Sequence, residues 1–186
     1  GLDRLGNETP GPVGTNFVIA RIPKGETKYV SYLTRIDGPS PTSGRRETQA
    51  TGENNGTWTP KGNGDYTYTF RNRLPSGYDR TVTHTIHLYG NRNLTEFDLG
   101  TDTADTVINF VPDGSPVTVV RDIVPQEACN RCHGQLSAHG TTGRRSVAGC
   151  ITCHTPQTVD AGTGNTADMG VMIHKIHMGR DLPSVK

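Results

Sequence analysis

The chain has 186 residues, a formal net charge of +1 and 31% hydrophobic residues. This length allows one or two domains, and the balanced charge gives no indication of a nucleic-acid or anionic-membrane surface. No run of about 20 apolar residues is present, so the sequence predicts no membrane-spanning helix. The first residues, Gly1-Leu2-Asp3, show neither a signal peptide nor a lipidation cysteine, which fits a mature chain or a fragment.

Residues 1–122 are predicted to form an antiparallel all-β domain, either a sandwich or a small barrel. Short apolar or alternating runs bounded by Gly, Pro or Asn predict strands. These strands are expected at residues 17–22, 29–33, 66–70, 81–89, 106–111 and 117–120. The polar stretch from Thr42 to Asn55 is predicted to be a long surface loop. His84 and His87 fall within a predicted strand, and we interpret both as sheet residues.

Two short motifs lie in the last third of the chain, at Cys129-Asn130-Arg131-Cys132-His133 and Cys150-Ile151-Thr152-Cys153-His154. Each has the form C-x-x-C-H, the attachment site of a c-type haem. In such a site two thiols on one turn bond to the porphyrin edge, and the next histidine binds the iron. The pattern predicts two covalently attached haem c groups with His133 and His154 as proximal ligands.

The four cysteines also allow two other interpretations. Seventeen residues separate Cys132 from Cys150, which fits a zinc ribbon, and four thiols can form two disulfides. Neither alternative requires a histidine directly after each pair. Histidine makes up 7 of 186 residues, so its chance occurrence at both positions is roughly one in 700. Haem is therefore the favoured interpretation.

The C-terminal third lacks the bulk of an ordinary core. All aromatic residues lie between Phe17 and Phe110, and the stretch from Ile123 to Lys186 has none. About sixty residues with scattered aliphatic side chains need a metal, disulfides or a cofactor to fold. We therefore predict a second domain, residues 123–186, in which two haems supply the apolar volume.

Three histidines in this region are candidates for the sixth iron position: His139, His174 and His177. Methionine ligation is the alternative and would raise the reduction potential. The available methionines are Met169, Met172 and Met178. Bis-histidine ligation would leave no open site for a substrate, which favours an electron carrier over an enzyme such as a dihaem peroxidase.

The first motif is predicted to lie on a helix that begins at Pro125, runs through Ala138 and ends at Gly140. On such a helix His139 lies about 240° around from His133. His139 would then point away from the first haem, and we expect it to serve the second.

Another helix is predicted from about Thr166 to Gly179. It places His174 and His177 on one face at positions i and i+3. Two imidazoles so close cannot bind opposite sides of one iron, so one of them is expected to serve the first haem. The other should lie at a chain end or subunit boundary, where it could ligate a neighbour's iron.

With these motifs in place, the segments at residues 128–140, 150–154 and 171–179 resemble the OmcA/MtrC family of extracellular multihaem cytochromes. The β region is similar in Gly64-Asp65-Tyr66-Thr67-Tyr68-Thr69-Phe70 and in Val111-Pro112-Asp113-Gly114. The resemblance implies a Greek-key β domain followed by a bis-histidine haem domain, with distal ligands at His139 and at the His174/His177 pair. It also implies electron transfer to extracellular acceptors such as metal oxides.

The chain departs from the family in having two motifs where the family has many, so it resembles the first β domain and the opening of the first haem domain. It is then either a fragment or a compact dihaem relative. We expect an exported electron carrier at the extracellular or outer-membrane surface, or in the periplasm, because covalent haem attachment follows export. Its expected partners are other cytochromes, identical subunits and external acceptors, and a filament of stacked subunits is the alternative.

Overall fold

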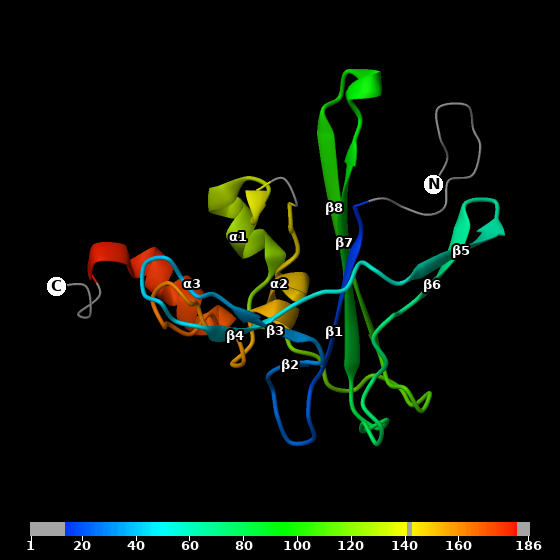
Figure 1. Ribbon diagram of the computed structural model, residues 1–186, viewed down its shortest axis with the longest axis horizontal. Helices are drawn as coiled ribbons and strands as arrows, with labels where there is room; N and C mark the ends of the chain where they lie inside the picture. Colours follow the sequence, from blue (N-terminus) through cyan, green and yellow to red (C-terminus); the bar gives the residue numbers. More distant parts are fainter. Residues whose placement is uncertain (1–13, 141–142, 182–186) are drawn as a thin grey trace.

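The computed structural model describes residues 14–140 and 143–181, and it combines antiparallel strands with short helices (Figure 1). The central sheet has the strand order β2-β1-β7-β8, and all neighbours are antiparallel. Its strands are β1 Asn16–Arg21, β2 Val30–Ser31, β7 His84–Asn93 and β8 Thr101–Phe110. Two separate hairpins are formed by β3 Thr34–Asp37 with β4 Glu47–Ala50, and by β5 Thr57–Gly62 with β6 Asp65–Thr69. The predicted antiparallel β class is confirmed, and no barrel closes within the described ranges.

Strand β1 lies between β2 and β7, and its apolar run is covered on both faces of the sheet. Val18 and Ala20 have no exposed surface, and Ile19 pairs with Ile86 of β7. His84 and His87 of β7 are also fully buried. Both histidines are therefore sheet residues, as the sequence predicted.

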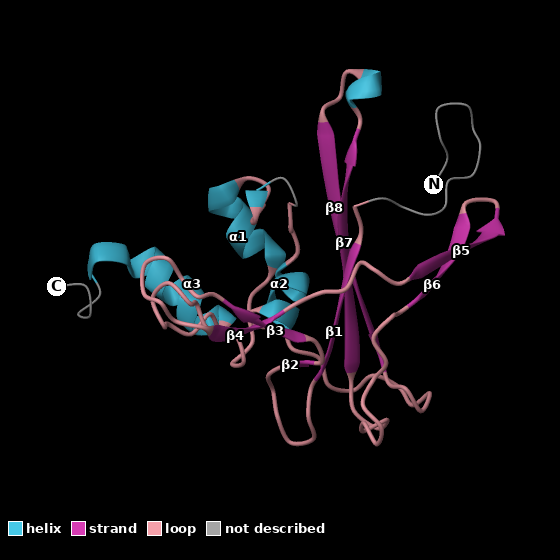
Figure 2. Cartoon of the chain, in the orientation of Figure 1, coloured by secondary structure: helices cyan, strands magenta, loops and turns pink. Residues whose placement is uncertain are grey.

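The β5–β6 hairpin projects from the sheet, away from the helices (Figure 2). It is held to β1 by aromatic packing, with the ring of Phe17 4.2 Å from Tyr68 and 5.4 Å from Phe70 between centroids. The buried carboxylate of Glu53 supports this contact by accepting hydrogen bonds from the backbone N–H groups of Arg71 and Asn72, at 2.6 and 2.9 Å.

Three short helices gather on the other side of the long β7–β8 hairpin (Figure 1). They are α1 Gln126–His133, α2 Val147–Cys153 and α3 Met169–Met178. A 3₁₀ turn at Thr95–Phe97 lies between β7 and β8, and another at Gly179–Asp181 follows α3. Helix α2 packs against β1, β7 and β8. The resulting core joins sheet and helices through Ala20, Ile22, Tyr29, Cys150, Ile151 and Met169. No helix in the described part of the chain is long and apolar enough to cross a membrane.

Several predicted strands need correction. Residues 117–120 form no strand, and Val117, Val119 and Val120 are 37, 48 and 54% exposed, because no neighbouring strand is available to pair with them. The expected loop from Thr42 to Asn55 contains β4, whose polar residues pair with the equally polar β3. The run at residues 29–33 contributes only the two residues of β2.

The first predicted helix is also shorter than expected. Helix α1 begins after Pro125, as predicted, but ends at His133, because Gly134 adopts φ = 64°. His139 therefore lies outside this helix, and its predicted position about 240° around the helix from His133 is wrong. Helix α3 does end at Gly179, as predicted.

Candidate haem sites

The second motif lies on α2, which is built into the sheet. Cys150 is 8% exposed, Ile151 2% and Thr152 0%, so the residues inside this motif belong to the core. Burial raises the pKa of the Cys150 thiol to about 11. Ser146 caps the helix by accepting a hydrogen bond from the Gly149 N–H at 2.9 Å.

A carboxylate of the sheet holds the start of α2. Asp105 of β8 accepts hydrogen bonds from the backbone N–H groups of Arg145 and Ser146, at 3.3 and 2.9 Å. It also lies 3.1 Å from Nε2 of the buried His87, whose ring packs against Gly149. Only glycine fits there, because any side chain at position 149 would collide with the imidazole.

The first motif lies on α1 and is arranged differently. No residue of α1 is buried, and Cys132 is exposed. The helix is joined to the start of α2 by the side chain of Gln126, whose carbonyl oxygen accepts a hydrogen bond from the Val147 N–H at 2.8 Å. The two motif helices are therefore linked at their first turns.

His139 and His154 come together as a pair. Their ring centroids are 5.9 Å apart and their planes differ by 24°. Nδ1 of His154 donates to the carbonyl oxygen of Ala167 at 3.0 Å, because a carbonyl can only accept, and this leaves Nε2 as the ring's electron-pair donor. Burial, together with the nearby charge of Arg144, lowers the pKa of both imidazoles.

His133 and His177 form a second pair. Their ring centroids are 6.2 Å apart and their planes are nearly perpendicular, at 87°. Nδ1 of His177 donates to the carbonyl oxygen of Ile173 at 2.8 Å, which again leaves Nε2 for a metal. Each motif histidine is thus paired with one of the predicted distal candidates.

Both separations fit two histidines on opposite sides of one metal. Metal–imidazole bonds are about 2.0–2.1 Å long and a ring centre lies about 1.1 Å behind its bonding nitrogen, so such centres are roughly 6 Å apart. The carbonyl partners of His154 and His177 are typical of metal-ligating histidines, in which the second ring nitrogen is held by a hydrogen bond. The residues present therefore fit a haem iron that would be held by two histidines at each motif.

The remaining candidates lie elsewhere. His174 is exposed on α3, three residues before His177. Met169 is buried in the core, Met172 packs against that core, and Met178 is 44% exposed. No disulfide joins the four cysteines, all of which lie in the described ranges, and within residues 14–140 and 143–181 no three His, Cys, Asp or Glu side chains converge on one point.

Sequence reasoning missed the residues that position these groups. Asp105 and His87 lie on strands, Arg144 precedes α2, and Gln126 begins α1. Each contacts groups far along the chain, and no local pattern marks them. One available signal was Asp105, an acidic residue directly before the run Thr106-Val107-Ile108, which is apolar or hydroxyl-bearing.

The chain is similar in sequence to outer membrane multihaem cytochromes. A family model described as outer membrane cytochrome MtrC/MtrF-like, domains II/IV, matches residues 121–184. The multiheme cytochrome MtrC of Shewanella baltica (strain OS185) is 28% identical over 137 residues, which cover 70% of this chain and 20% of that protein. The chain is related to the OmcA/MtrC cytochromes.

Solved OmcA/MtrC structures share the fold. The outer membrane decaheme cytochrome OmcA superposes with a TM-score of 0.70 at 21% identity, covering 96% of this chain and 30% of that one. MtrC from Shewanella baltica OS185 superposes with a TM-score of 0.64 at 25% identity, covering 98% and 30%. The chain spans 20% of the length of its curated OmcA/MtrC relative.

Proposed function

We propose that this chain carries two covalently attached haem c groups and transfers electrons outside the cytoplasmic membrane. The observation that carries the proposal is the pairing of His133 with His177 and of His154 with His139, at centroid separations of 6.2 and 5.9 Å. The relationship to the OmcA/MtrC cytochromes supports it, since the family match covers both C-x-x-C-H motifs. When bound, each haem supplies a one-electron redox centre.

The protein's own residues hold and orient these centres. Cys129 and Cys132 would attach the first haem, and Cys150 and Cys153 the second. The carbonyl oxygens of Ile173 and Ala167 fix the rings of His177 and His154 through Nδ1, which aims Nε2 at the metal. Two histidines would hold each iron and would leave no position for a substrate, so the proposed role is electron transfer without catalysis at the iron.

The same proposal divides the chain into a β domain, residues 1–122, and a dihaem module, residues 123–186. The linkage of α1 to α2 through Gln126 and Val147 keeps the two motifs together. The acceptors we propose are other cytochromes and external oxidants such as metal oxides, at the extracellular or outer-membrane surface. The localisation rests on the relatives, which are named as outer membrane cytochromes.

A second candidate function is a subunit of a polymeric cytochrome filament. It is favoured by the exposure of His174 on α3, while His177 lies beside His133. We propose that His174 ligates an iron outside the two sites of this chain, either in a further segment of a longer protein or in a neighbouring subunit.

Intact mass in denaturant, combined with a pyridine haemochrome count, tests the cofactor. We expect two covalent haems per chain. A variant in which one pair of motif cysteines is replaced should carry one haem per chain. A colourless protein that holds zinc would overturn the proposal.

Single histidine substitutions test the ligand assignment. His139→Ala and His177→Ala should each open one iron, so that each variant binds one carbon monoxide per chain. His174→Ala is the matched control on the same helix as His177 and should leave the monomer with two six-coordinate, low-spin haems. Carbon monoxide binding by His174→Ala and not by His177→Ala would contradict the assignment.

A further inference from the structure

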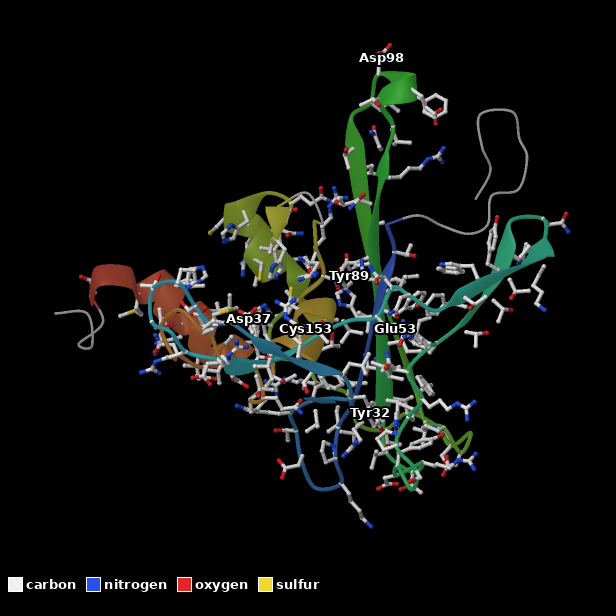
Figure 3. The ribbon with its side chains drawn as sticks, in the orientation of Figure 1. Tyr32, Asp37, Glu53, Tyr89, Asp98 and Cys153 are labelled. Atoms are coloured by element: carbon white, nitrogen blue, oxygen red, sulfur yellow. The ribbon has the colours of Figure 1, made fainter. Side chains whose placement is uncertain are left out.

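Arg144 occupies a central place beside the second motif. Its backbone pairs with Ala138 in both directions, at N···O distances of 3.1 and 3.0 Å, directly before the candidate ligand His139. Its guanidinium lies over the ring of Tyr89, 4.2 Å from the centroid, and donates to the Tyr89 hydroxyl at 2.9 Å. Tyr89 is a buried residue of β7 and is labelled, like Cys153 at the end of α2, in Figure 3.

The charge of Arg144 is not neutralised by any carboxylate of the described chain. Its Nε is buried without a hydrogen-bond partner, and none of the ion pairs among the described residues includes it. Asp105 accepts from His87 and from two backbone N–H groups at the start of α2. A half-buried guanidinium without a counter-ion is costly, so a bound anion would be strongly favoured.

The surroundings of Arg144 place its charge beside the second site. Its bridge partner Ala138 directly precedes His139, whose ring pairs with that of His154 at 5.9 Å. The Tyr89 ring under the guanidinium lies 5.1 Å from the ring of His87, which contacts Gly149 of α2. Arg144 is therefore joined to the second motif through the loop that carries His139 and through strand β7.

We infer that Arg144 is the counter-ion of a haem carboxylate at the second motif and raises the reduction potential of that haem. The inference rests on the proposed function. A guanidinium binds a carboxylate through two parallel hydrogen bonds, and each haem carries two propionate carboxylates. A fixed positive charge near the iron favours the reduced state, because reduction removes one positive charge from the iron.

Spectroelectrochemical titration of the holoprotein tests this role. Arg144→Gln should lower one of the two midpoint potentials by an amount equal to about a tenfold change in the reduced-to-oxidised ratio, which is about 59 mV for one electron. The second potential and the haem count should stay as in the unaltered protein. Arg145→Gln is the matched control. It removes the same charge from the neighbouring residue, whose guanidinium already pairs with Asp102 at 3.5 Å.

Arg144→Lys keeps the charge and provides a second test if Arg144→Gln does not attach its haems. It should retain most of the potential, while the propionate band of one haem shifts in the resonance Raman spectrum, since an ammonium cannot form the paired contact. Unchanged potentials in Arg144→Gln, equal shifts in Arg144→Gln and Arg145→Gln, or an unshifted Raman band in Arg144→Lys would overturn the inference. A preparation without covalent haem would instead refute the proposed function.

Discussion

The two C-x-x-C-H motifs share a pattern but differ in how the protein supports them. On α2 the motif is part of the core, with Ile151 2% exposed, whereas no residue of α1 is buried. The residues between the cysteines explain this difference, since the second motif contains Ile and Thr where the first contains Asn and Arg. The second site is therefore built on the sheet, and the first would depend on the proposed haem for packing.

Removing each pair of thiols gives the largest expected effect. Cys150→Ala with Cys153→Ala should expose the whole of residues 123–186 to protease, because α2 joins that module to the sheet. Cys129→Ala with Cys132→Ala should expose α1 while α2 stays protected. Hydrogen exchange resolved by segment would show the contrast, and equal loss of protection in both variants would remove the distinction between the sites.

A core substitution within the second motif should have the second-largest effect on stability. Ile151→Ala is expected to cost about 2–5 kcal/mol of unfolding free energy, because the side chain is enclosed by β1 and α3 residues. Ile36→Ala makes the same truncation at a site that is 63% exposed, and should change stability by no more than about 0.5 kcal/mol. Denaturant unfolding of both variants would measure the difference, and similar costs would argue against a core position for Ile151.

Two glycine substitutions sharpen the comparison between helices. Gly149→Ala should cost about 1–3 kcal/mol, because its Cβ would collide with the His87 ring. Gly170→Ala on α3 meets only the Asp168 carboxylate at 3.8 Å and should be neutral or stabilise by up to about 1 kcal/mol. Thermal unfolding provides the measurement, and a tolerated Gly149→Ala would show that α2 is free to move away from β7.

The smallest expected effect is a dependence on pH. Burial, partly offset by Asp105, lowers the pKa of His87 in the folded state. The unfolded chain then binds more protons, so this contribution to stability is complete above about pH 6.5 and declines as the pH falls below it. His87→Gln should flatten the decline by at most about 1.4 kcal/mol per pH unit. An unchanged slope between the two proteins, measured by denaturant unfolding, would mean that His87 does not titrate on unfolding.

The sequence predicts the secondary-structure elements that are determined by a local pattern of residues. The apolar run of β1, the alternation of β6 and the glycine end of α3 each carry a local signal, and the structure follows them. The end of α1 was missed because Gly134, inside an otherwise helical pattern, adopts a left-handed φ of 64°. Residues 117–120 have the composition of a strand but lack a partner, which depends on the whole fold.

The candidate site divides in the same way. Both motifs could be recognised from sequence because their chemistry requires fixed spacing. His139, which pairs with His154, directly follows the bridge between Ala138 and Arg144, which joins residues apart in sequence. The expected pairing came from a helix that ends too early to support it. Asp105 and Arg144 act across long sequence separations, so only the folded chain reveals them.

If each histidine pair ligates one iron, as proposed, the angles between the paired imidazoles would make the two irons magnetically distinct. Planes that differ by 24°, as in His139 and His154, separate the energies of the two iron orbitals that interact with the imidazoles. Planes that differ by 87°, as in His133 and His177, leave those orbitals nearly equal in energy. In a frozen ferric sample, electron paramagnetic resonance would then show an ordinary rhombic low-spin spectrum from the second haem and a single feature at very low field from the first. The two redox centres could thus be followed separately in one sample without altering a residue.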